Sequence, residues 1–200
     1  MMAVVVDWRR IASWRIARGE PTGQDIKIGS YDAYLATPDP SNSHQGCGIL
    51  YCPDVIGIWQ NAKLIADQYA ANGYLCLIID LFNGDALPLN FGDDADFNIM
   101  TWIAQGSTGD NPHTPEAIDP IVAQAIEWLK VNKNVKKLGA VGYCIGAKVG
   151  LFSFPVDASW SKRSCTVTNT SVSLVRHTPH SRSPGGLRCP SGLRWEGRAC

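Results

Sequence analysis

The sequence has no long apolar run and comparatively few charged residues. No run reaches the roughly 18 apolar residues that a membrane-spanning helix needs, so we expect no integral membrane protein. Charged residues make up 18% of the 200 residues and hydrophobic residues 45%. This apolar share is normal for a globular domain, and it excludes a disordered chain, a coiled coil or a collagen-like chain. The length suits one domain with a sizeable core.

The seven cysteines form no C-x-x-C pair, and no convincing secretory signal precedes them. A structural zinc site is therefore not expected. The number is odd, and Cys47, Cys52 and Cys76 lie in or beside apolar strand-like runs, where a free cysteine behaves as a small hydrophobic residue. We predict free thiols in a reducing, cytoplasmic compartment, with no metal and no other cofactor.

The net charge of zero conceals two differently composed segments. Residues 1–154 carry 11 Lys and Arg against 16 Asp and Glu, whereas residues 155–200 carry 7 against 2. A basic segment can bind nucleic acid or an anionic surface. This one has no aromatic interleaving and no recognisable module, so we interpret residues 155–200 as a basic, low-order tail and expect no nucleic-acid partner. Within it, residues 166–175 alternate weakly and could make one strand.

Residues 1–20 are interpreted as an N-terminal extension. They include four arginines and could form a short basic amphipathic helix, for which mitochondrial targeting is an alternative interpretation. Residues 21–154 form the domain. His44 and His113 fall in loop-like stretches of it and are expected at the surface. The acidic residues Asp93, Asp94 and Asp96 fall in an irregular stretch, residues 81–112, and are expected to belong to a solvated lid or a helix start rather than to bind a cation.

Strand and helix patterns alternate along the domain. Strand-like runs cover residues 26–36, 48–52, 74–80 and 138–141. A helix is predicted after Trp59, with Gly73 as its stop, and another from Thr114 as N-cap. The second has an apolar stripe made of Ile118, Ile121, Val122, Ala125, Ile126 and Leu129. This order predicts an α/β fold, an open parallel sheet with helices on both faces.

The strongest chemical signal is Gly142-Tyr143-Cys144-Ile145-Gly146, which follows a strand and precedes a helical segment. This is the nucleophile-elbow pattern G-x-S-x-G with Cys in place of Ser. The turn is so tight that side chains at the glycines would collide with neighbouring elements. The pattern makes Cys144 a candidate nucleophile at a helix N-terminus, whose dipole favours thiolate. The backbone N–H of Ile145 would then face a developing oxyanion.

A second strand ends at Tyr51-Cys52 and continues into Pro53-Asp54-Val55-Ile56-Gly57. In a hydrolase built on such an elbow, this loop supplies the other oxyanion donor, which by position is the N–H of Val55. Asp54 would lie near Cys144, within hydrogen-bonding or one-water reach of its sulfur.

These motifs resemble the dienelactone hydrolase family (carboxymethylenebutenolidase-like), within the α/β-hydrolase fold. The matching stretch runs from about residue 21 to residue 150. It contains Pro53–Gly57, Asp80-Leu81-Phe82-Asn83-Gly84-Asp85, and Gly142–Lys148, in the family's order. The resemblance implies a Cys–His–Asp triad that opens a small-molecule ester or lactone through an acyl-enzyme. It also implies that an acid at the place of Asp54, usually Glu, contacts the resting thiol.

The sequence departs from the family pattern in two places. Asn83-Gly84-Asp85 stands where bacterial members use an Arg, which argues against dienelactone itself as the substrate. After residue 150 the family continues with the triad Asp and then the triad His, but Asp157, His177 and His180 lie in no recognisable family context. The sheet is therefore expected to be incomplete at its C-terminal end, as in a truncated or frame-shifted product.

Two functions remain open at this stage. The first is a thiol-dependent hydrolase of esters or lactones. The alternative is a catalytically inactive fragment, because a chain without the triad His lacks the base that generates the thiolate.

Overall fold

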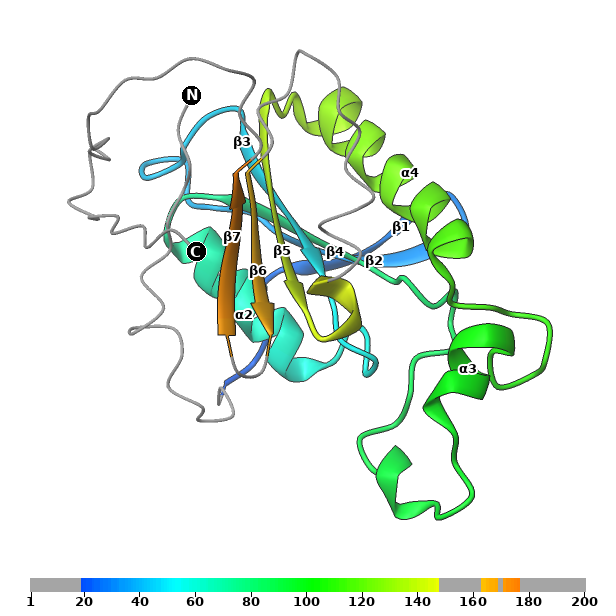
Figure 1. Cartoon of the computed structure of the whole chain (residues 1–200). Helices are drawn as coiled ribbons and strands as arrows, with labels where there is room; N and C mark the ends of the chain where they lie inside the picture. Colours follow the sequence, from blue (N-terminus) through cyan, green and yellow to red (C-terminus); the bar gives the residue numbers. More distant parts are fainter. Residues whose placement is uncertain (1–18, 148–162, 169–170, 177–200) are drawn as a thin grey trace.

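The computed structural model describes residues 19–147, 163–168 and 171–176, which form one sheet with helices on both of its faces (Figure 1). Residues 1–18 and the rest of the chain after residue 147 lie outside this description. None of the described helices is long and apolar enough to cross a membrane. The elements are β1 (Gln24–Ile28), β2 (Tyr31–Ala36), β3 (Cys47–Cys52), α2 (Gln60–Ala71), β4 (Leu75–Ile79), η1 (Phe91–Asp93), α3 (Ile99–Gln105), α4 (Pro115–Lys133), β5 (Lys137–Tyr143), β6 (Arg163–Thr168) and β7 (Ser171–Arg176).

The strands lie in the order β1-β2-β4-β3-β5-β6-β7. β4, β3, β5 and β6 are parallel, whereas β1, β2 and β7 join the sheet antiparallel to their neighbours. The predicted α/β class is confirmed, but the sheet is mixed rather than parallel throughout. The run predicted as one strand over residues 26–36 is a hairpin, because Gly29 takes a positive φ of 61° and reverses the chain.

Each face of the sheet has its own apolar core, because successive strand residues point to opposite faces. On β2, Ala33 and Leu35 belong to the core that contains the buried side chains of α4, whereas Tyr34 and Ala36 belong to the core that contains those of α2. β3 and β4 alternate in the same way. The two helices therefore cover opposite faces, as Figure 1 also shows.

The two main helices follow their predicted patterns. α2 ends at Ala71, and Gly73 follows with a positive φ of 90°. α4 begins at Pro115 with Thr114 as N-cap, although the Thr114 side chain makes no capping hydrogen bond. The six stripe residues from Ile118 to Leu129 are all buried, because their spacing places them on one face of the helix.

The irregular stretch contains a helix, α3, whose bounds the sequence pattern did not predict. α3 begins after Asn98, whose side chain accepts hydrogen bonds from the N–H groups of Met100 and Thr101, and it ends at Gln105 with Gly106 as its C-cap. η1 and α3 lie away from the sheet (Figure 1). Asp93, Asp94 and Asp96 are exposed. Among the described residues, no group of three or more His, Cys, Asp or Glu side chains could hold a metal ion.

The sheet continues beyond β5. β6 pairs parallel with β5, and β7 pairs antiparallel with β6. β5 is therefore not an edge strand of the sheet. The single strand expected over residues 166–175 is instead a pair, 163–168 and 171–176. A weak alternation does not reveal where one strand stops and the next begins.

Candidate functional site

Cys144 occupies the sharp turn that follows β5. Its φ is 53°, in the left-handed region that non-glycine residues rarely adopt, and residues 145–147 are helical. The N–H of Ala147 donates to the carbonyl of Cys144 at 3.1 Å and closes the turn. The Cys144 side chain is exposed. The strand-to-helix turn is thus where the sequence predicts it, and its strained backbone presents a thiol to solvent.

The two glycines of the motif allow this turn to pack against its surroundings. A Cβ on Gly146 would overlap the carbonyl oxygens of Cys52 and Pro53, at the end of β3. A Cβ on Gly142 would overlap backbone atoms of Gly146 and Ala147. The collisions expected from the sequence are therefore present. They show that the Cys144 turn lies directly against the loop that follows β3.

That loop is organised around Asp54. Its carboxylate accepts a hydrogen bond from the N–H of Ile56 at 2.9 Å, and its carbonyl accepts one from the N–H of Gly57 at 2.9 Å. Burial raises the pKa of Asp54, while the bonds from Ile56 and from the Trp59 side chain act in the opposite direction. No hydrogen bond joins Asp54 to Cys144 among the described residues. One-water reach between them stays a prediction.

The two predicted oxyanion donors are the N–H groups of Val55 and Ile145. Val55 is buried and Ile145 half-buried. No described residue accepts a hydrogen bond from either N–H group. The contact between Gly146 and the end of β3 brings the two segments that carry them together.

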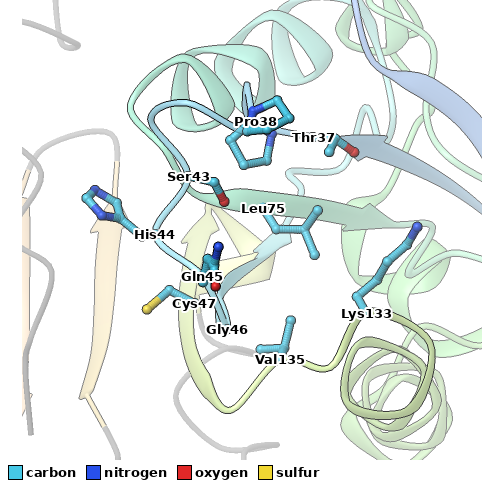
Figure 2. A pocket seen from close by; sticks show the side chains of 11 residues that line it. Thr37, Pro38, Ser43, His44, Gln45, Gly46, Cys47, Leu75, Lys133 and Val135 are labelled. Carbon is cyan, nitrogen blue, oxygen red and sulfur yellow. The ribbon is translucent and has the colours of Figure 1, made fainter.

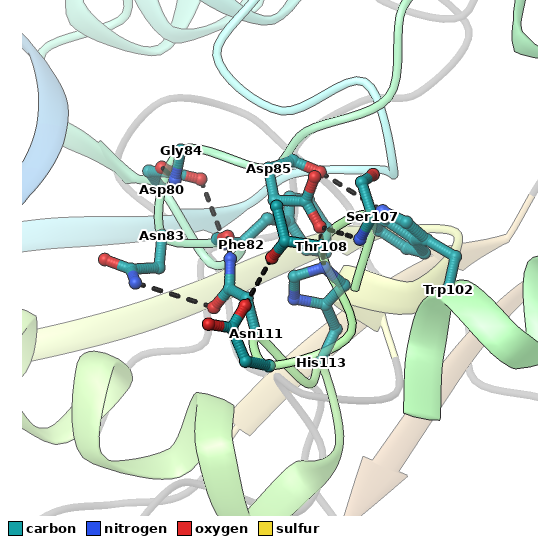
Figure 3. Close-up of polar contacts among 11 residues, drawn as sticks. Asp80, Phe82, Asn83, Gly84, Asp85, Trp102, Ser107, Thr108, Asn111 and His113 are labelled. Carbon is teal, nitrogen blue, oxygen red and sulfur yellow. Dashed lines mark hydrogen bonds and ion pairs between the residues drawn. The ribbon is translucent and has the colours of Figure 1, made fainter. Parts of the chain in front are cut away.

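A third polar group follows β4, at the same edge of the sheet (Figure 3). Asp80 is only 6% exposed, and its carboxylate accepts hydrogen bonds from the N–H groups of Phe82 at 2.9 Å and Gly84 at 2.6 Å. Asp85 follows Gly84 directly in the chain. Its carboxylate accepts hydrogen bonds from the N–H of Ser107 at 2.8 Å and from Nε2 of His113 at 2.8 Å.

His113 is buried, not at the surface as expected. Its side chain is 1% exposed and lies against the rings of Trp102, at 4.2 Å between centroids, and Phe82, at 5.4 Å. Burial of the Asp85 carboxylate acts to raise its pKa. The hydrogen bonds from Ser107 and His113 outweigh this effect, so the pKa of Asp85 is lowered. Sequence reasoning missed this pair because its members lie 28 residues apart. Asp85 itself is the last residue of the motif Asp80-Leu81-Phe82-Asn83-Gly84-Asp85.

The remaining candidates lie elsewhere. His44 is exposed, as expected, and it lines a pocket of about 290 Å³. Figure 2 shows this pocket around the segment that enters β3, with Leu75 at the start of β4 and Val135 before β5. It therefore lies at the opposite edge of the sheet from Cys144. Asp157, His177 and His180 lie outside the described residues.

Comparison with known proteins identifies relatives over most of the described chain. The model of the "Dienelactone hydrolase family" matches residues 31–159. "Hydrolase pyvD" of Aspergillus violaceofuscus is 37% identical over 65% of this chain and 49% of its own length. "Dienlactone hydrolase 1" of Gibberella moniliformis is 38% identical over 87% of this chain and 65% of its own. The chain thus spans about half to two thirds of the length of these relatives.

A solved structure supports the fold. A putative dienelactone hydrolase from Klebsiella pneumoniae is 15% identical, with a TM-score of 0.53, over 70% of this chain and 57% of its own. At this identity the likeness shows the arrangement of strands and helices alone.

Proposed function

Because the chain belongs to the dienelactone hydrolase family, we propose that it hydrolyses small-molecule esters or lactones through a thioester on Cys144. The observation that carries this proposal is the left-handed backbone of an exposed Cys144, at a turn that only the two flanking glycines allow. Such a turn presents a nucleophile above the sheet, where an acyl group can approach it.

In the first step, the Cys144 thiolate attacks the acyl carbon and forms a carbon–sulfur bond. The carbonyl electron pair moves to its oxygen, and the N–H groups of Val55 and Ile145 stabilise the negative charge. Both groups suit this role because no described residue accepts a hydrogen bond from them. When the oxyanion's electron pair re-forms the carbonyl, the bond to the alcohol oxygen breaks, and the alcohol takes up the proton that the Cys144 thiol had given to Asp54. Loss of one such donor costs about 10²–10³ in rate in a well-studied protease.

Asp54 is proposed to act on the resting thiol through one water molecule. Its raised pKa means that it takes up a proton at a higher pH than an ordinary Asp, so it can accept one from a nearby thiol more readily. The other cysteines fit a reducing, cytoplasmic setting. Cys52 and Cys76 are buried, and burial raises the pKa of both thiols, so neither competes as a nucleophile.

In the second step, water attacks the thioester, the carbon–sulfur bond breaks, and the carboxylic acid leaves. This step needs a base to take a proton from the water, and a base contributes about 10²–10⁴ to such a step. His44 lies at the wrong edge of the sheet, and His113 is buried against Asp85. The histidines that follow Cys144 in the chain are His177 and His180. Without a contribution from one of them, we expect the chain to acylate and then turn over slowly.

The test is a reaction with p-nitrophenyl acetate, followed by mass spectrometry of peptides. We expect one rapid release of p-nitrophenol per chain and an acetyl group on the Cys144 peptide. Cys144→Ala should abolish both. The matched control is Cys47→Ala, because Cys47 is a partly exposed cysteine at the other edge of the sheet; this variant should react like the wild type.

The slow steady rate after the burst tests the second step. Sustained turnover that depends on Cys144 and is lost in His177→Ala or His180→Ala would assign the base to that histidine. A wild-type chain that shows no burst and no acetylated Cys144 would contradict the proposed hydrolase and favour a catalytically inactive fragment.

A further inference from the structure

The Asp85–His113 pair joins a buried histidine to a partly buried carboxylate, and the proposed reaction does not use it directly. The segment around Asp85 is fixed by several bonds at once. Besides the two bonds to its carboxylate, its carbonyl accepts a hydrogen bond from the indole N–H of Trp102 at 3.2 Å, and its own N–H donates to Phe82 at 3.0 Å. Few backbone dihedrals remain free at a residue constrained in this way, so the residues that follow have a defined position.

Those following residues contact the loop that carries Val55. The N–H of Leu87 donates to the carbonyl of Val55 at 2.8 Å, and Leu87 is 5% exposed and Val55 9%. Loss of a hydrogen bond at such a buried place leaves the carbonyl unsatisfied and is costly. A Cβ on Gly57 would also lie 2.7 Å from the Cβ of Ala86, so the two loops touch there. A continuous path of contacts thus leads from His113 through Asp85 and Leu87 to Val55.

We propose that Asp85 and His113 are positioning residues that fix the Val55 loop through the Leu87–Val55 hydrogen bond. The catalytic part of this inference rests on the proposed function, in which the Val55 N–H binds the oxyanion. Asp85 and His113 touch no reacting atom. Their removal should therefore slow the step that needs the oxyanion donor and leave the thiol of Cys144 as accessible as before.

Two variants break the pair in different ways. His113→Phe keeps an aromatic ring between Trp102 and Phe82 but removes the bond to Asp85. Asp85→Ala removes the carboxylate itself, and with it the bonds to both His113 and Ser107; it decides the question if His113→Phe does not fold. The matched control is Asp93→Asn, which neutralises an exposed carboxylate on the same stretch of chain.

Three measurements are made on each full-length variant. Amide hydrogen exchange of Leu87 reports the bond to Val55, the burst with p-nitrophenyl acetate reports acylation, and iodoacetamide reports the reactivity of Cys144. In His113→Phe we expect Leu87 to exchange about tenfold faster or more, and acylation to slow by about 10- to 100-fold. Alkylation should be unchanged, and Asp93→Asn should match the wild type throughout.

Unchanged protection of Leu87 in a folded His113→Phe would overturn the proposal. So would unchanged acylation, or a parallel fall in acylation and alkylation, which indicates general damage. If the wild type does not acylate at all, the proposed function fails instead, and the exchange of Leu87 alone then decides whether the pair fixes the loop.

Discussion

Replacing Gly146 by Ala tests the packing on which the Cys144 turn depends. The added methyl group would overlap the carbonyl oxygens of Cys52 and Pro53. Both are backbone atoms, which cannot rotate away as the end of a flexible side chain can, so the turn or the end of β3 must shift. The φ of Gly146 lies outside the left-handed region, and the whole cost is therefore steric.

Overpacking of this kind costs about 1–3 kcal/mol, and two backbone neighbours favour the upper end. A loss of about 3 kcal/mol lowers the melting temperature of a chain of this size by about 6–12 °C. The displaced loop also carries Asp54 and Val55, so acylation of Cys144 should fall while its alkylation by iodoacetamide continues.

The assay is chemical denaturation, with Gly92→Ala as the matched control. A Cβ on Gly92 meets no atom within 4 Å, so its free energy of unfolding should change by less than about 0.5 kcal/mol. If Gly146→Ala proves as harmless as Gly92→Ala, the turn does not pack against β3 and the reasoning fails.

Three further outcomes are expected. Because burial raises the pKa of Asp54, this carboxyl group binds its proton more tightly in the folded state than in the unfolded state, where its pKa is about 3.9. The free energy of unfolding should therefore fall as the pH rises from the unfolded-state pKa through the folded-state pKa. Asp54→Asn should lose this dependence and be more stable than the wild type at neutral pH in denaturation curves, and equal stability would contradict it. The Tyr34 hydroxyl donates to Asp67 at 2.7 Å and accepts from a backbone N–H, so Tyr34→Phe should cost about 1–3 kcal/mol of unfolding free energy, and a neutral effect would count against the network. Iodoacetamide should label Cys144 in the native protein. It should label Cys52 only after unfolding, because burial raises the pKa of that thiol to about 12. Peptide mapping of the protein labelled in the native and in the unfolded state tests this, and labelling of Cys52 in the native protein would contradict it.

The Cys144 turn could be predicted because its determinants are local. A strand, two glycines four residues apart and a following helical pattern define it, and the collisions at Gly142 and Gly146 are those that such a turn requires. α4 could be predicted for the same reason, since its six buried apolar residues follow helical spacing. In both cases the deciding interactions lie within about one element and its nearest neighbour.

The features that sequence reasoning missed depend on distant residues. In the sequence, His113 has the pattern of a loop histidine. Its burial depends on contacts with Trp102 of α3 and with Phe82 and Asp85, which follow β4. α3 has seven residues, too few for a clear apolar period, although Asn98 and Gly106 mark its ends. The split of residues 26–36 was signalled by Gly29, whose positive φ makes the hairpin turn. The roles of Cys144, Asp54, Val55 and Ile145 stay predictions.

The position of β5 beside β3 determines the order in which the chain can assemble. β1 and β2 meet across a turn of two residues, whereas Cys47 of β3 pairs with Lys137 of β5, 90 residues later. Closing so long a loop is entropically costly, and pairing between distant strands slows folding. During synthesis, the hairpin and α2 have all their own residues well before β5 emerges to complete the centre of the sheet. The turn that carries the Cys144 thiol follows β5 directly. The reactivity of this thiol should therefore develop only after most of the fold has formed.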